Sequence, residues 1–93
     1  MVVEQQQYKY KYKKKMNNKK LLKAFTEGLE IEESLVVDSL EYQSIEQWDS
    51  ISHMILISEI EEVFDIELDT DDVIEMSSVA KAKEIISKHG FEF

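Results

Sequence analysis

Apolar positions at helical spacing recur in several parts of the chain, with stretches that follow no period between them. The first run predicts a helix with Asn18 as its N-cap and Gly28 near its end. Residues 30–48 then follow no sustained period, and a loop of this length often carries function or a short turn of helix. Its scattered apolar residues are expected to pin it to the core. The apolar positions of the first helix are Leu21, Leu22, Phe25 and Leu29.

The strongest helix is predicted from Asp49, a favourable N-cap, to about Phe64, with Ser50 in its first turn. At roughly 100° per residue, its apolar side chains fall on two separate faces. The core stripe consists of Leu56, Ile57, Ile60, Val63 and Phe64. The second face consists of Ile51, Met54 and Ile55, in an arc that also holds Ser50, Ser58, Glu61 and Glu62.

The second face has two interpretations. A small bundle does not need it to complete a core, so the face is a candidate docking surface for a partner, apolar and bordered by acidic residues. Met54 suits such a surface, because methionine adapts to several partners. Alternatively, the long loop or the short helix covers these residues.

Two further helices complete the prediction. Residues 69–72 cap a short helix over residues 73–76, and Ser77 or Ser78 caps the last helix. Gly90 stands where a helix C′ residue belongs. We expect an all-α fold, a small bundle of three main helices plus one short helix, with a long loop between the first and second helices. The apolar face of the last helix consists of Val79, Ala82, Ile85 and Ile86.

Charge divides the chain. Residues 1–23 hold eight lysines and one glutamate, and residues 24–93 hold three lysines and nineteen acidic residues. We therefore predict a basic, low-complexity and disordered extension over residues 1–16 and a folded domain over residues 17–93, with Met16 as a candidate start. The extension has an alternative reading as an arm for nucleic acid or an anionic surface, but a net charge of −9 argues against nucleic acid as the main partner.

Composition narrows the functional classes. The 93 residues suffice for one small domain and contain no cysteine, which excludes disulfides, thiolate zinc sites and a cysteine nucleophile. No apolar run is long enough for a membrane span, and no secretory signal precedes the domain. We expect a cytoplasmic monomer without stable membrane association.

The sequence offers little support for an active site within this chain. Ser50, His53 and Asp49 superficially suggest a nucleophile, a base and an orienting acid, but no glycine-rich turn supplies an oxyanion hole. The acidic run that begins at Asp65 fails as a calcium loop, because position six is Thr70 and position twelve is Met76. We expect no catalytic residues and no metal site.

Ser50 is the remaining candidate. A first-turn serine suits a phosphate group, because free backbone N–H groups and the helix dipole stabilise an anion. The neighbouring Asp49 opposes that charge, so an enzyme would have to attach the phosphate. The residues equally allow the interpretation that Asp49 or Ser50 is simply a helix cap.

The chain resembles an acyl carrier protein over about residues 21–89, in the order of its helices and in three motifs. The motifs are QWDSI at residues 47–51, IEEVFDIEL at residues 60–68 and SSV at residues 77–79. The resemblance implies that Ser50 carries 4′-phosphopantetheine, whose thiol holds an acyl or aminoacyl group as a thioester, and that Asp49 helps to present Ser50. It implies an acyl resting place in or near the groove between the second and third helices.

The resemblance also implies the partners, which perform the catalysis. They are a phosphopantetheinyl transferase and acyl-activating, acyltransferase or synthase enzymes. Glu61 and Glu62 would meet basic residues on these partners, and the apolar contact would come from Ile51, Met54 and Ile55.

Three departures from the family pattern indicate a specialised carrier, of polyketide-like, surface-polysaccharide or aminoacyl-modifying systems, rather than the carrier of primary fatty acid synthesis. Ile51 replaces the usual leucine, Trp48 replaces a small residue, and Ile55 replaces an acid. The alternatives are a helical interaction adaptor without a prosthetic group and an acidic metal-binding protein.

Overall fold

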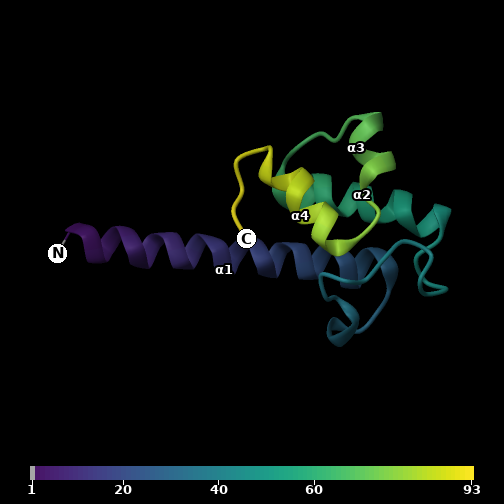
Figure 1. Ribbon diagram of the computed structural model, residues 1–93, viewed down its shortest axis with the longest axis horizontal. Coiled ribbons are helices and arrows are strands. Elements are labelled where there is room, and N and C mark those ends of the chain that lie inside the picture. The colour runs from purple at the N-terminus through teal and green to yellow at the C-terminus, as the bar shows by residue number, and fades with distance from the viewer. Residues whose placement is uncertain (1) are drawn as a thin grey trace.

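The computed structural model consists of four α-helices and one short 3-10 helix (Figure 1). It describes the backbone of residues 2–93 and the side chains of residues 11–93. The described residues contain no strand, and one isolated bridge joins Glu41 to Ser78. The predicted all-helical bundle with a long loop after the first helix is therefore confirmed. The elements are α1 (Val2–Leu29), η1 (Glu33–Leu35), α2 (Ser50–Phe64), α3 (Thr70–Glu75) and α4 (Val79–Ser87).

The sequence predicted that the first helix begins at Asn18, and this is wrong. Helix α1 continues back to Val2, through the segment where we expected disorder. Asn18 lies inside the helix, and its side-chain amide donates to the Lys14 carbonyl at 2.9 Å. The segment before Asn18 contains neither proline nor glycine, so nothing in it breaks a helix. No side chain among residues 11–20 is buried. The division into an extension (1–16) and a domain (17–93) stays a prediction.

Helix α1 ends at Leu29 through a change of backbone conformation at the next residue. Glu30 has a φ of 54°, and the Ile31 N–H donates to the Thr26 carbonyl at 3.2 Å. This is the hydrogen bond that closes a Schellman motif, in which glycine usually occupies the position of Glu30. Leu21, Phe25 and Leu29 are buried, as their spacing predicted.

Helices α1 and α2 approach each other closely at Gly28. A Cβ atom at this position would lie 2.9 Å from the Leu56 Cα atom. Gly28 therefore lets the two backbones meet, whereas the sequence suggested only that it lies near the end of the helix. The core stripe of α2 is confirmed, with Val63 half-buried and four members buried. The buried members are Leu56, Ile57, Ile60 and Phe64.

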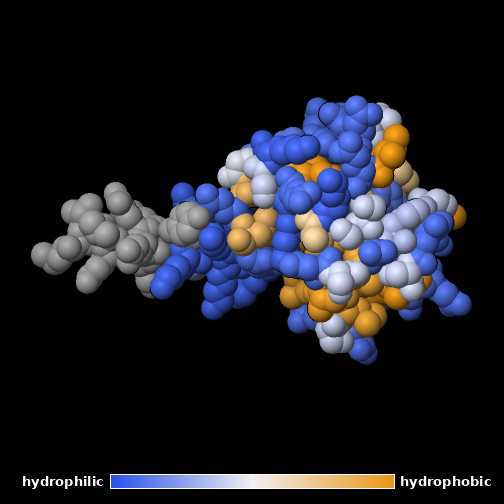
Figure 2. All heavy atoms as spheres, viewed as in Figure 1, coloured by the Kyte–Doolittle hydropathy of each residue, from blue (hydrophilic) through white to orange (hydrophobic). Residues whose placement is uncertain are grey.

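The long loop is held to the core mainly by Leu40 and Trp48, which are buried. The Trp48 ring meets the ring of Phe25 edge to face, with 5.4 Å between centroids. Of the other loop residues expected to pin it, Leu35 and Val37 are instead exposed, and apolar surface gathers over this loop in Figure 2. The predicted short turn of helix in the loop is present as η1.

The last two helices begin at predicted N-cap residues, but α3 starts at Thr70 rather than at residue 73, so residues 70–72 lie inside the helix and not before it. Asp69 caps α3, and Ser78, rather than Ser77, caps α4. The apolar face of α4 is buried, and Gly90 takes a φ of 96° after the helix. The chain end then returns towards α1 (Figure 1), where the Asn17 side chain donates to the Glu92 carbonyl at 3.0 Å. None of the helices in the described part of the chain is long and apolar enough to cross a bilayer.

Candidate functional site

The start of α2 is fixed by a reciprocal capping box between Asp49 and Ser52. Asp49 Oδ1 accepts from the backbone N–H groups of Ile51 at 3.0 Å and Ser52 at 2.9 Å. In return, the Ser52 hydroxyl oxygen accepts from the Asp49 N–H at 2.9 Å, and the hydroxyl donates to the Gln47 carbonyl at 2.6 Å. Asp49 therefore pairs two amides of the helix start, which is otherwise a place of unpaired donors, and Ser52 pairs the amide of Asp49.

The hydrogen bonds at this helix start also set the ionisation of Asp49. The backbone N–H of Ser52 is the largest contribution, and it lowers the pKa of the Asp49 carboxyl below its ordinary value of 3.8. Hydrogen bonds donated to a carboxylate favour its charged form. Asp49 is therefore a carboxylate at neutral pH, one residue before Ser50.

Ser50 lies between these two capping residues and takes no part in the cap. It is exposed, and no hydrogen bond engages its hydroxyl within the described part of the chain. Of the two interpretations left open by the sequence, the capping role belongs to Asp49. The hydroxyl of Ser50 is left free for chemistry.

The role of Ser52 was missed by the sequence analysis. The signal was present, because a polar residue three positions after an N-cap is the pattern of a capping box. The usual acid or amide of that pattern is here a serine, whose shorter side chain still reaches the Asp49 N–H.

The second face of α2 is uncovered. The exposed fractions are 73% for Ile51, 55% for Met54 and 49% for Ile55. The alternative that the long loop or the short helix covers these residues is therefore wrong. Ile74 on α3 is also exposed, at 74%, and apolar atoms show beside α3 in Figure 2.

The two glutamates expected to meet partners differ in their surroundings. Glu62 is exposed, whereas Glu61 is half-buried and its carboxylate accepts from the Leu68 N–H at 2.9 Å. Glu61 therefore holds the segment that follows α2, and Glu62 is the more accessible charge. Their predicted roles in partner binding stay predictions.

His53 does not face Ser50 as a catalytic base. One of its ring nitrogens, Nδ1, lies 2.9 Å from Trp48 Nε1, and Nε2 lies 2.8 Å from the Val73 carbonyl oxygen. Both nitrogens are thus engaged inside the fold, and Asp49 is engaged in the cap. The three side chains that superficially suggested a triad do not assemble into one.

The acidic run after α2 has structural roles at both ends. Asp65 takes a left-handed conformation with a φ of 52°, and Asp69 accepts from the Asp72 N–H at 2.8 Å. Among the described residues, no three carboxylate or imidazole side chains converge in a way that would hold a metal ion.

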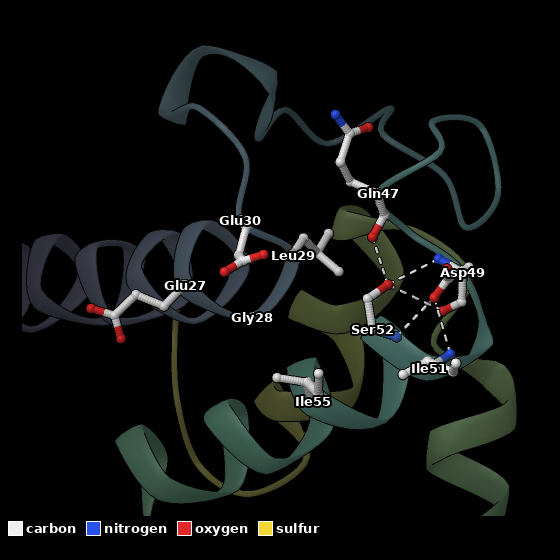
Figure 3. Close-up of a pocket in the computed structure, with 9 residues that line it drawn as sticks. All are labelled: Glu27, Gly28, Leu29, Glu30, Gln47, Asp49, Ile51, Ser52 and Ile55. Carbon is white, nitrogen blue, oxygen red and sulfur yellow. Dashed lines mark hydrogen bonds between the residues drawn. The ribbon is translucent and has the colours of Figure 1, made fainter.

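An open hollow of about 400 Å³ lies between the end of α1 and the start of α2 (Figure 3). Gly28, Leu29, Ile51 and Ile55 are its apolar lining, and Glu30 lies on the side of the long loop. The sequence resemblance implied an acyl groove between α2 and α3, which stays a prediction. The hollow described here is on the α1 side of α2.

Comparisons with protein-family models, with curated proteins and with solved structures find no match to this chain.

Proposed function

We propose that this protein is a carrier that bears 4′-phosphopantetheine on Ser50 and presents a thioester-bound acyl or aminoacyl group to partner enzymes. One observation carries the proposal. Ser50 is an exposed first-turn serine with an unengaged hydroxyl, beside the uncovered apolar face of Ile51, Met54 and Ile55.

The surroundings of Ser50 favour covalent attachment over anion binding. Two amides of the first turn, those of Ile51 and Ser52, already donate to Asp49, so they are not free for a phosphate. The charge of Asp49 also disfavours a loosely bound anion. A phosphate at this position is best held by a bond to the Ser50 oxygen, which leaves the attached arm free to move.

The exposure of Ser50 supports the attachment of this prosthetic group. Neither the hydroxyl of Ser50 nor the space outside it is occupied by another part of the described chain. Loading joins the Ser50 oxygen to the phosphate of the phosphopantetheine half of coenzyme A. The adenosine bisphosphate half leaves, and the hydroxyl proton passes to a base of the transferase. The thiol of the arm then carries the cargo.

Partners complete the chemistry in this proposal. A transferase and the enzymes that load and unload the arm would contact Ile51, Met54 and Ile55, with Glu62 as an exposed charge for basic side chains. The chain itself would supply no catalytic group. Trp48 and Ile55 depart from the pattern of primary fatty acid carriers, so we propose a specialised pathway and a cytoplasmic, monomeric carrier.

An adaptor without a prosthetic group is the second candidate, because the same uncovered face would serve it. The two candidates differ at Ser50, which is essential to a carrier and incidental to an adaptor. Ser50→Ala would therefore abolish the function of a carrier and leave the binding of an adaptor unchanged.

The test is the intact mass after incubation with coenzyme A and a broad-specificity phosphopantetheinyl transferase, followed by peptide mapping. We expect the mass of one phosphopantetheine to be added at Ser50 and nothing to be added to Ser50→Ala. Ser87→Ala is the control, since Ser87 is an exposed serine on another helix, α4, and should not affect loading. A folded, initially unmodified protein that gains no mass would contradict the proposal and favour the adaptor.

A further inference from the structure

We propose that the hollow between the end of α1 and the start of α2 is a socket for an arginine side chain on a basic, apolar segment of a partner protein. The inference rests on the proposed carrier function and deepens it, because it names the chemistry by which a partner would seat itself beside Ser50. The occupant follows from the lining, which joins apolar surface to negative charge.

The size of the hollow suits a single side chain with room to spare. Its volume of about 400 Å³ is at the lower end of the range of small-molecule sites, roughly 300–1,000 Å³. Gly28 lets the end of α1 approach α2 closely, so its backbone forms one wall of the hollow. Leu29 from α1 and Ile51 and Ile55 from α2 supply apolar surface.

All the charged residues that line the hollow are acidic. Glu27, Glu30 and Asp49 line the hollow, and none of its lining residues is basic. Glu27 also borders a neighbouring hollow that is lined by Lys19 and Lys23, but no ion pair joins it to either lysine among the described residues. Glu30 is exposed and makes no ion pair or side-chain hydrogen bond within the described residues.

Glu30 holds a defined place at the mouth of the hollow. Its left-handed backbone and the bond from the Ile31 N–H to the Thr26 carbonyl fix the point where its side chain leaves the chain. Figure 3 shows Glu30 at the end of α1, where the chain turns into the long loop, with Leu29 between it and Gln47. A cation that enters from outside would meet Glu30 while its stem contacts Ile51 and Ile55.

Arginine matches this lining better than lysine. The guanidinium group of arginine is planar and weakly hydrated, and it can donate two hydrogen bonds to one carboxylate. The methylene groups that carry it are apolar and can contact apolar walls. Lysine would bring a more strongly hydrated point charge to a site with apolar walls.

The hollow is continuous with the uncovered face of α2. Ile51 and Ile55 belong to both, and Ser50 lies beyond Ile51, roughly 100° around the helix. A partner that covers Ile51 and Ile55 on its way to Ser50 therefore also covers the hollow. An arginine seated there would fix the register of the partner on α2.

The test is a titration of the unmodified protein, followed through its backbone amide signals by NMR. The probe is the peptide acetyl-Leu-Arg-Leu-amide, and its match carries citrulline, which has the shape of arginine without the charge. We expect signals at Gly28, Glu30 and Ile55 to move with the arginine peptide and to move less at the same concentration of the citrulline peptide. Glu30→Gln should weaken the arginine peptide about two- to fivefold.

The control variant is Glu67→Gln, which removes an exposed acid from the segment between α2 and α3. It should bind the arginine peptide as the parent does. The inference would be overturned if the protein bound both peptides equally, or if Glu30→Gln and Glu67→Gln lost the same affinity for the arginine peptide. It would also be overturned if the amide signals that shift belonged to residues of α3 and α4. Movement of the same signals with protein concentration alone would assign the hollow to a second copy and also overturn it.

The outcome is separable from that of the carrier proposal, because the titration needs no prosthetic group. A protein that gains phosphopantetheine on Ser50 but does not distinguish arginine from citrulline would refute the socket alone. A protein that binds arginine in the hollow but gains no phosphopantetheine would refute the carrier alone.

Discussion

The indole N–H of Trp48 donates a hydrogen bond to Nδ1 of His53 at 2.9 Å. An indole nitrogen is a donor only, so Nδ1 must be the acceptor and the proton of the neutral ring must sit on Nε2. That proton points to the Val73 carbonyl oxygen, 2.8 Å away. A single imidazole in one tautomer therefore joins the loop before Ser50 to α3.

Replacement of His53 by phenylalanine is expected to destabilise the fold. An aromatic ring is kept, but the buried Trp48 N–H loses its acceptor and the Val73 carbonyl loses its donor. An unsatisfied buried polar group costs about 1–3 kcal/mol, so we expect the free energy of unfolding to fall by about 2 kcal/mol. Urea unfolding followed by the fluorescence of Trp48, the single tryptophan, measures the change. His89→Phe, at an exposed position, should have little effect, and equal losses in both variants would contradict the assigned role of His53.

Gly28→Ala is expected to destabilise the protein although alanine favours helices. The new Cβ would lie 2.9 Å from the Leu56 Cα, a backbone atom that cannot move aside by rotation. The higher helix propensity of alanine stabilises the fold by about 1 kcal/mol, whereas overpacking typically destabilises it by about 1–3 kcal/mol. We therefore expect the free energy of unfolding to fall. The thermal midpoint of unfolding should fall, whereas that of Ser87→Ala on α4 should stay or rise slightly. A higher midpoint for Gly28→Ala would show that α1 and α2 have room to separate.

Asp49 is expected to make stability depend on pH in the acid range. Its folded pKa is lowered from 3.8, chiefly by the Ser52 N–H, so its contribution is present above the unfolded pKa and is lost as the pH falls through the folded pKa. Asp49→Asn keeps a good cap but removes this titration. The difference in urea midpoint between parent and variant should therefore shrink as the pH falls from neutrality through 3.8 and below. A difference independent of pH would mean that the charge of Asp49 does not stabilise the helix start.

Ile51→Ser tests the uncovered face of α2 in the proposed loading reaction. Ile51 is 73% exposed, so stability should change little. If the transferase buries this side chain, kcat/KM for the transfer of phosphopantetheine to Ser50 should fall about tenfold, as for an anchor residue at an interface. The control is Val37→Ser, an exposed apolar residue on the long loop that should leave loading unchanged. An unchanged rate for Ile51→Ser would remove Ile51 from the docking surface.

The sequence predicted the elements that depend on local signals. Asp49, Asp69 and Ser78 are N-caps in the structure, because short polar side chains at these positions satisfy the first amides of a helix. The core stripe of α2 and its separate exposed face followed from helical periodicity. The position of Ser50 in the first turn could be predicted for the same reason.

Features that depend on contacts between distant residues were not predictable in this way. The start of α1 was misplaced, because Asn18 resembles a cap and only the unbroken helix-forming segment before it opposes that assignment. The close approach at Gly28 and the bridge through His53 each join parts of the chain that no local pattern relates. The hollow depends on both α1 and α2, and its lining residues are separated by the whole long loop.

The capping box separates the folding of α2 from whatever happens at Ser50. The bonds that start the helix belong to the residues before and after it, so position 50 has no structural task of its own. A substituent can therefore be added there, exchanged or removed without rebuilding the helix. The bare and the modified chain would share one fold, and a partner would meet the same scaffold at every stage of a cycle.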